Sequence, residues 1–280
     1  MNPALAGLLS ALFYGVGDFL SGLSGRHDAP LRIAALTHPI AALALLALAL
    51  LLGAPLPPAS DLWWGALAGA IGLGAVLAFY RGLALGPMGP VSVGAGALSA
   101  AVPVAFGVLG GEVLGALGWT GAAGILSGTV LLSLIPGGTG QGGVSAKDNG
   151  VLLGLVAGVG FGFYFVALGQ AQSAAGLLWT LAAARLASSL IVVPIAALTM
   201  GLRPSRPALL LASAPGDTLG NLFYLMAVQG GGLALAGLLT SLYPALTTLL
   251  AVIVLRERLR ASQWGGVVLA LAGAALLTAG

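Results

Sequence analysis

Apolar stretches long enough to cross a lipid bilayer follow one another along almost the whole chain. A helix of about 20 apolar residues spans a hydrocarbon core of roughly 30 Å. Clusters of glycine, proline and charged residues divide the chain into ten such stretches: 3–24, 31–52, 62–85, 90–110, 116–135, 151–172, 177–200, 208–229, 233–255 and 262–279. Only 6% of the residues are charged, against roughly 25% in an ordinary soluble domain. The sequence therefore predicts an all-α integral membrane protein with ten transmembrane helices.

The two halves of the chain repeat each other. Glu112 and Glu257 lie 145 positions apart, and each precedes a tryptophan by seven residues. His38 aligns with Arg185 at an offset of 147. A polar, glycine-rich segment separates the halves. We therefore predict a first five-helix repeat at 1–135, a connecting loop at 136–150 and a second five-helix repeat at 151–280.

An odd number of spans per half has a consequence for orientation. The second half must enter the membrane in the opposite sense, which makes the halves inverted repeats. Secondary transporters are commonly built this way, with the substrate near the midplane between the repeats. We therefore expect a carrier that works by alternating access, whose partners are a small-molecule substrate and the lipid bilayer. A monomer suffices for this, and the oligomeric state is left open.

Other classes of function lack support in the sequence. The chain contains no HExxH, GxSxG or phosphate-loop motif, and its lack of cysteine excludes a thiolate metal site. Its ten Lys and Arg residues form no patch for nucleic acid. An intramembrane enzyme would need clustered catalytic groups, and a passive channel a continuous polar stripe along one span. We therefore predict no enzymatic activity, no cofactor, no metal and no nucleic-acid partner.

Each half also carries a short motif. The second half contains Pro244, Arg256–Glu257, Trp264 and Gly266, and the first contains Gly111–Glu112, Trp119 and Gly121, with Ser99 where the second has its proline. Over essentially the whole chain, these features resemble the EamA family of the drug/metabolite transporter superfamily. The resemblance implies a multi-pass protein of the cell inner (plasma) membrane that exports amino acids or related metabolites. A broad multidrug exporter is the alternative.

Ionisable residues inside apolar spans cost about 2.5–3.5 kcal/mol on insertion scales, so each needs a role. Arg185 either binds a substrate carboxylate or pairs with Asp18 or Asp217. Asp217 follows Pro215–Gly216, which predicts a helix break whose new N-terminus Asp217 caps. Asp18, His38 and Asp217 are the candidates for proton coupling, with a purely structural hydrogen bond as the alternative for Asp18 and His38.

Three tyrosines lie near the middles of spans, where a hydroxyl needs a partner. We expect Tyr14, Tyr164 and Tyr243 to line one cavity between the halves, with packing alone as the alternative. The predicted substrate-binding set is Tyr14, Asp18, Tyr80, Ser99, Tyr164, Arg185, Asp217, Asn221, Tyr224 and Tyr243.

Further residues are predicted to serve packing or the membrane interface. Glycines at 150, 154, 158 and 162 form a ridge that lets another helix approach closely. Arg81 is expected to extend to the interface, and Glu112 and Glu257 to be interfacial or gate residues. The five tryptophans lie near span starts, as in an aromatic belt.

Basic residues predict the orientation of the chain, because short cytoplasmic loops retain Lys and Arg. The odd-numbered loops and their flanks hold nine of these residues, and the even-numbered loops and both termini hold none. We therefore predict both termini outside the cytoplasm and the 136–150 loop inside it.

Overall fold

The computed structural model describes residues 1–85, 88–133, 149–173, 176–256 and 261–279. These residues form ten helical elements and no strand, and α8 and α9 follow each other almost without interruption. The elements are α1 (Pro3–Gly25), α2 (Pro30–Leu51), α3 (Ala59–Leu85), α4 (Met88–Leu109), α5 (Ala116–Ser133), α6 (Gly150–Gly169), α7 (Leu177–Thr199), α8 (Pro207–Thr240), α9 (Tyr243–Leu255) and α10 (Ala261–Ala279).

Six apolar helical stretches in the described residues are long enough to cross a membrane. They are α1, α2, α3, α6, α7 and the stretch 207–255, which combines α8 and α9. Side chains such as Leu43, Leu190 and Leu198 are exposed on the outside of the bundle. Apolar residues outside as well as inside are typical of helices that face lipid.

Matching residues begin the two halves. Asn2 caps α1, because its side-chain oxygen accepts the N–H of Ala4 at 2.8 Å. Asn149 caps α6 in the same way, through the N–H of Leu152 at 3.2 Å. An N-cap oxygen satisfies one of the backbone donors that a helix start leaves free.

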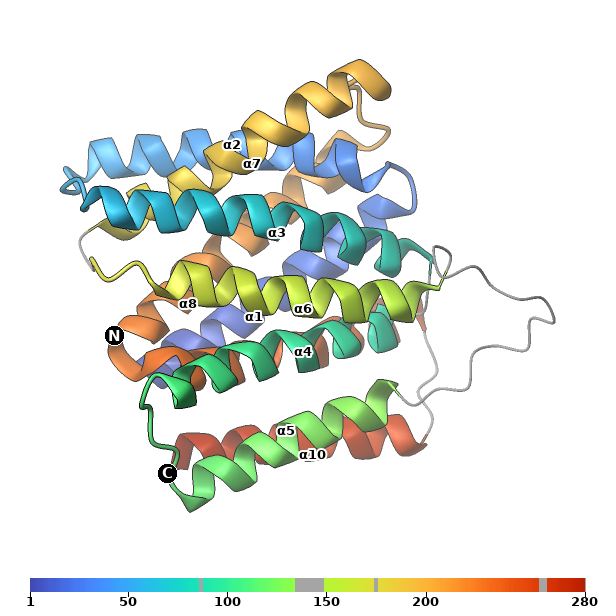
Figure 1. The fold of residues 1–280 in the computed structure, drawn as a ribbon. Helices are drawn as coiled ribbons and strands as arrows, with labels where there is room; N and C mark the ends of the chain where they lie inside the picture. Colours follow the sequence, from blue (N-terminus) through green and yellow to red (C-terminus); the bar gives the residue numbers. More distant parts are fainter. Residues whose placement is uncertain (86–87, 134–148, 174–175, 257–260, 280) are drawn as a thin grey trace.

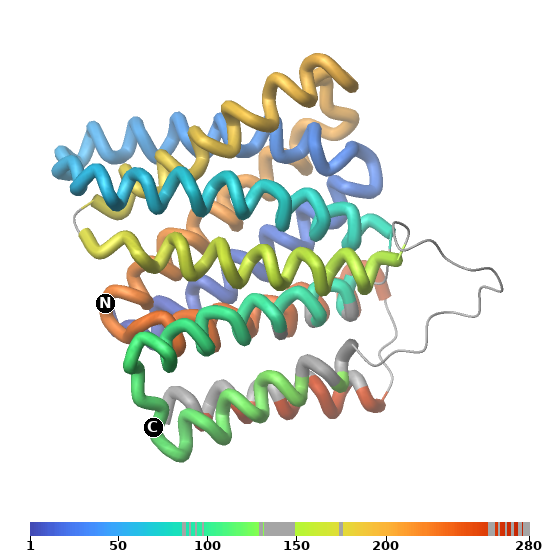
Figure 2. Tube along the Cα trace, viewed as in Figure 1, coloured from blue at the N-terminus to red at the C-terminus, as the bar shows by residue number. Residues whose placement is uncertain are grey.

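Helices at equivalent places in the two halves pack together. Figure 1 shows α2 beside α7, and α5 beside α10 as a pair set apart from the other helices. The contact of α1 with α8 has its equivalent in the contact of α6 with α3. The same arrangement is seen in the trace of Figure 2. The start of α1 and the end of α10 lie at one end of the bundle, and the end of α5 and the start of α6 lie at the other (Figure 1).

The glycine ridge of α6 packs against α4, as the sequence predicts. A Cβ atom on Gly154 would lie 2.5 Å from the carbonyl oxygen of Val91, and one on Gly158 would lie 2.5 Å from that of Ala95. Only glycine permits this backbone-to-backbone approach.

The predicted helix break at Pro215–Gly216 is wrong. α8 continues through these residues, and its non-helical residue is Gly232, with φ 80° and ψ 174°. Gly216 packs directly on Gly17 of α1, since an added Cβ would lie 2.5 Å from the Gly17 Cα. Neighbouring helices permit such a proline inside a membrane helix. Asp217 therefore lies within a helix and does not cap one.

The break at Gly232 has a cap from the other half of the chain. The Glu112 carboxylate, from the α4–α5 connection, accepts the N–H groups of Leu233 at 2.8 Å and Ala234 at 2.9 Å. These are the first free donors of the segment that follows the break. Glu112 thus lies near the end of the bundle and joins the two halves. Glu257 is outside the described residues.

Candidate functional site

A small cavity lies where seven helices meet near the middle of the bundle. Its open space is about 30 Å³, room for about one or two water molecules. Its walls come from both halves of the chain: Tyr14, Asp18, His38, Gly69, Gly72, Leu73, Val76, Tyr80, Phe161, Tyr164, Phe165, Ala184, Arg185, Asp217 and Tyr243.

One asparagine joins two of the tyrosines. The hydroxyls of Tyr14 in α1 and Tyr164 in α6 both donate to Oδ1 of Asn221 in α8. The Asn221 side-chain amide in turn donates to the Asp217 backbone oxygen at 2.8 Å and to its Oδ1 at 3.1 Å. Asn221 therefore links two tyrosines from opposite halves to Asp217.

Arg185 pairs with Asp217. Its Nη2 lies 2.5 Å from Oδ2 of Asp217, and Arg185 is only 7% exposed. A buried guanidinium needs such a counter-ion. Two roles are predicted for Arg185, binding of a substrate carboxylate and pairing with an aspartate. In the structure it pairs with an aspartate.

His38 contacts Arg185 and completes this network. Nη1 of Arg185 lies 3.3 Å from Nε2 of His38, and Nδ1 of His38 lies 2.9 Å from the hydroxyl of Ser188. A guanidinium can only donate, so we assign Nε2 as the acceptor and Nδ1 as the protonated nitrogen. A second proton, on Nε2, would make His38 a cation in contact with the Arg185 guanidinium. His38 is therefore an acceptor for Arg185 here, which favours a structural role.

Asp18 differs from the other charged groups of the cavity. Among the described residues it makes no hydrogen bond and no ion pair, and its interactions are electrostatic ones with residues such as Asp217 and Tyr243. Since Arg185 is matched by Asp217, the cavity has one carboxylate without a counter-ion.

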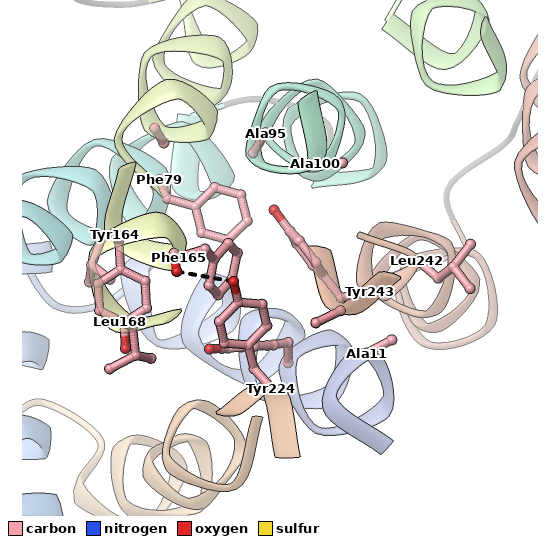
Figure 3. Close-up of a cluster of buried hydrophobic side chains, with 14 of the residues drawn as sticks. Ala11, Phe79, Ala95, Ala100, Tyr164, Phe165, Leu168, Tyr224, Leu242 and Tyr243 are labelled. Atoms are coloured by element: carbon pink, nitrogen blue, oxygen red, sulfur yellow. Dashed lines mark hydrogen bonds between the residues drawn. The ribbon is translucent and has the colours of Figure 1, made fainter. Parts of the chain in front are cut away.

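Aromatic rings surround these polar groups. Figure 3 shows Phe79, Tyr164, Phe165, Tyr224 and Tyr243 gathered between the helices. Phe165 lies at the centre of this cluster, with ring centroids 5.4 Å from Tyr164 and 4.5 Å from Tyr224. The Tyr224 hydroxyl donates to the Phe165 backbone oxygen at 3.0 Å, which holds Tyr224 in the core beside the cavity.

The structure brings most of the predicted site residues together. Those that line the cavity are Tyr14, Asp18, His38, Tyr80, Tyr164, Arg185, Asp217 and Tyr243. Asn221 lies behind the wall and orients two of them, and Ser99 and Tyr224 are buried outside the lining set. The expectation that Tyr14, Tyr164 and Tyr243 line one cavity is met, and their contact with a substrate stays a prediction.

Sequence reasoning missed several lining residues. Phe161 and Phe165 belong to an apolar run in which nothing distinguishes them from packing residues. Gly72 contacts the Tyr164 ring, since an added Cβ would lie 2.6 Å from a ring carbon. Ser188, which contacts His38 but does not line the cavity, is in the sequence only a small polar residue one helical turn after Arg185.

Polar contacts close the bundle at the end where α1 meets α2. The Asp28 carboxylate accepts the N–H of Ser205, in the α7–α8 connection, at 2.9 Å and a hydrogen bond from Arg32 at 2.9 Å. Arg32 also donates to the Met200 backbone oxygen at 3.0 Å. Burial of Asp28 favours its neutral form, but the hydrogen bonds from Arg32 and Ser205 outweigh burial and lower the pKa of Asp28.

At the opposite end of the bundle, the α6–α7 and α2–α3 connections meet in the way that the α1–α2 and α7–α8 connections do. The Asp61 carboxylate, at the start of α3, accepts the N–H of Ser173, in the α6–α7 connection, at 2.9 Å. The indole N–H of Trp179 donates to the Ala54 backbone oxygen at 2.9 Å. Trp179, in the first turn of α7, thus ties this helix to the α2–α3 connection, whereas Trp63, Trp119 and Trp264 are exposed near helix starts. The described residues contain no group of three or more His, Asp or Glu placed to hold a metal ion.

Comparison with known proteins identifies a family for almost the whole chain. The model of the EamA-like transporter family matches residues 1–134 and 148–279. A solved structure, described only as the crystal structure of a protein, superposes with a TM-score of 0.71 at 22% identity over 99% of this chain and 97% of that chain. This likeness shows a shared fold. No curated protein sequence matches the chain.

Proposed function

The chain belongs to the EamA-like transporter family of membrane proteins, and we propose that it is a secondary carrier that exports small organic metabolites. In this proposal all ten helices cross the inner (plasma) membrane, including α4, α5 and α10. The two halves form inverted five-helix repeats, and exchange of their conformations opens the site to alternate sides. The monomer is the transporting unit.

One observation carries the proposal: a cavity that contains an ion pair and several hydroxyls among apolar walls is lined by both halves of the chain. α1, α2 and α3 of the first half and α6, α7, α8 and α9 of the second each contribute lining residues. Movement of one half against the other would therefore change the shape of the cavity. Ionisable groups inside a membrane bundle are costly, and they commonly mark a functional site.

Contacts at both ends support the alternating-access part of the proposal. Asp28 joins the α1–α2 and α7–α8 connections, and Asp61 joins the equivalent pair at the other end. With both sets formed, the cavity is too small for an organic molecule. This arrangement suits an occluded state. Release of the Asp28 contacts or of the Asp61 contacts would then open the cavity at one end of the bundle.

Amino acids and related metabolites are the substrate class that we propose. The cavity combines an ion pair, a second carboxylate and several hydroxyls, which favours polar molecules over the purely apolar ligands of a broad multidrug exporter. Asp18 is the proposed proton-coupling group, because Asp217 is occupied by Arg185 and Asn221, and His38 accepts from Arg185.

Transport assays with the purified protein test this function. Proteoliposomes loaded with unlabelled amino acids should accumulate the labelled amino acid by counterflow. The double variant Gly154→Leu/Gly158→Leu, which would push α4 from α6, should abolish counterflow. Absence of counterflow across amino acids, amines and organic acids with correctly inserted protein would contradict a carrier function.

A further inference from the structure

The unmatched carboxylate of Asp18 distinguishes the central cavity from a site built for anions. The charged lining groups are Asp18, Asp217 and Arg185, and the last two neutralise each other at 2.5 Å. With His38 neutral and Asp18 ionised, these groups have a formal charge of −1. An unpaired carboxylate inside a membrane protein is costly and is stabilised by a cation.

Arg185 is poorly placed to bind a second anion. Its guanidinium contacts the Asp217 carboxylate through Nη2 and His38 through Nη1. A substrate carboxylate would have to displace Asp217 while it faces the negative charge of Asp18. The charged lining group that can still pair with a ligand is therefore a carboxylate, that of Asp18.

The rings of the cavity suit a cation as well. Tyr14, Tyr80, Tyr164, Tyr243, Phe161 and Phe165 all line it. Aromatic faces attract ammonium groups, and the attraction grows as water is excluded. The groups that interact electrostatically with Asp18 include Tyr14 from α1, Tyr80 from α3, Asp217 from α8 and Tyr243 from α9.

We propose that the central cavity recognises its substrate through an ammonium group, with Asp18 as the counter-ion and the tyrosine rings around it. This inference rests on the proposed carrier function and specifies its substrate class as amines and zwitterions that carry a free ammonium group. A molecule that carries only a carboxylate is excluded. Asp18 here touches the substrate directly, whereas Asn221 positions Tyr14 and Tyr164.

A matched set of probes tests the proposal. 2-Phenylethylamine, phenylalanine and 3-phenylpropionate share one ring and differ in charge. Titration calorimetry on the purified full-length protein in detergent should detect binding of the amine and the zwitterion, and none of the acid. Asp18→Asn should weaken amine binding at least tenfold, and Thr120→Val, on the exposed side of α5 away from the cavity, should leave it unchanged.

The contrary results are equally specific. Binding of 3-phenylpropionate more tightly than the amine, no binding of any probe, or unchanged amine affinity in Asp18→Asn would each overturn the ammonium site. The comparison of the three probes on the unaltered protein decides the matter even where Asp18→Asn does not fold.

Transport measurements separate this inference from the function on which it rests. Amine binding that depends on Asp18, without counterflow of any probe in proteoliposomes, would support the site and contradict the carrier. Counterflow that is independent of Asp18 would support the carrier and overturn the site.

Discussion

Arg185 and Asp217 form an ion pair inside an apolar bundle, where the Arg185 side chain is 8% exposed and the Asp217 side chain 24%. Breaking a buried pair by removing one partner leaves an uncompensated charge, at a cost of about 3–5 kcal/mol. Replacement of both partners by apolar residues is often nearly neutral. The pair is therefore expected to show strong energetic coupling.

A double-mutant cycle tests this coupling. Arg185→Leu and Asp217→Leu should each lower the melting temperature of the detergent-purified protein strongly, and the double variant should recover most of the loss. The physical reason is that the double variant leaves no lone charge. Additive losses in the double variant would show that the two side chains do not depend on each other.

The charged residues of this site can be predicted from the sequence. Asn221, which links them to the tyrosines, stands out much less. Arg185, Asp18 and Asp217 are rare charges within apolar spans. Asn221 gains its importance from geometry, since two tyrosines on different helices meet at its side-chain oxygen. No local pattern encodes such a meeting.

Among the helices, α8 shows how packing overrides local preference. Pro215–Gly216 favours a break by itself, yet α8 stays helical there because it packs closely on Gly17 of α1. The chain breaks instead at Gly232, the last of three consecutive glycines. The predicted spans 208–229 and 233–255 correspond to α8 (Pro207–Thr240) and α9 (Tyr243–Leu255), so the helix element continues past the break at Gly232. The bounds of the other helices follow the apolar pattern.

Glu112 should stabilise the α8 break. Glu112→Ala removes the acceptor for the N–H groups of Leu233 and Ala234, and should cost about 1–3 kcal/mol, because hydrogen bonds to charged groups are stronger than neutral ones. Glu112→Gln keeps the length and one oxygen, and should lose less. Thermal unfolding of the three proteins measures the difference, and equal melting temperatures would show that the cap contributes nothing.

The contact of α6 with α4 depends on Gly158. Gly158→Ala places a methyl 2.5 Å from a backbone oxygen, so the helices must separate, at a cost of about 1–3 kcal/mol. Gly74→Ala in α3 is the matched control, because an added Cβ there meets nothing within 4 Å. The control should change stability by less than about 1 kcal/mol. Equal effects on melting temperature would contradict close packing at Gly158.

The contacts of Asp28 should make stability depend on acid pH. Its pKa is lowered in the folded protein, so its contribution is present above the ordinary aspartate pKa of about 3.9 and is lost as pH falls through the folded pKa. In Asp28→Asn this acid-dependent loss should be absent. Melting temperatures measured from neutral pH downward compare the two proteins, and parallel curves below about pH 4 would contradict the prediction.

At the scale of the whole molecule, residues and helices at equivalent positions of the two halves contact each other. His38 and Arg185 align between the halves at an offset of 147, and their side chains touch. Equivalent helices pair in the same way, α2 with α7 and α5 with α10. Residues related by a two-fold axis can touch only near that axis. The network of Arg185 therefore lies at the centre of the proposed inverted repeat.

Topology is the last prediction. α1 begins and α10 ends at one end of the bundle (Figure 1), and Arg26, Arg32, Arg203 and Arg206 belong to connections at the other end. Because basic residues are retained in the cytoplasm, both termini should lie outside it. Alkaline phosphatase fused after Gly280 should therefore be active in a bacterial inner membrane, and a fusion after Gly143, in the 136–150 loop, should be inactive. An inactive phosphatase after Gly280, together with an active cytoplasmic reporter at the same point, would reverse the orientation and show that these arginines do not determine it.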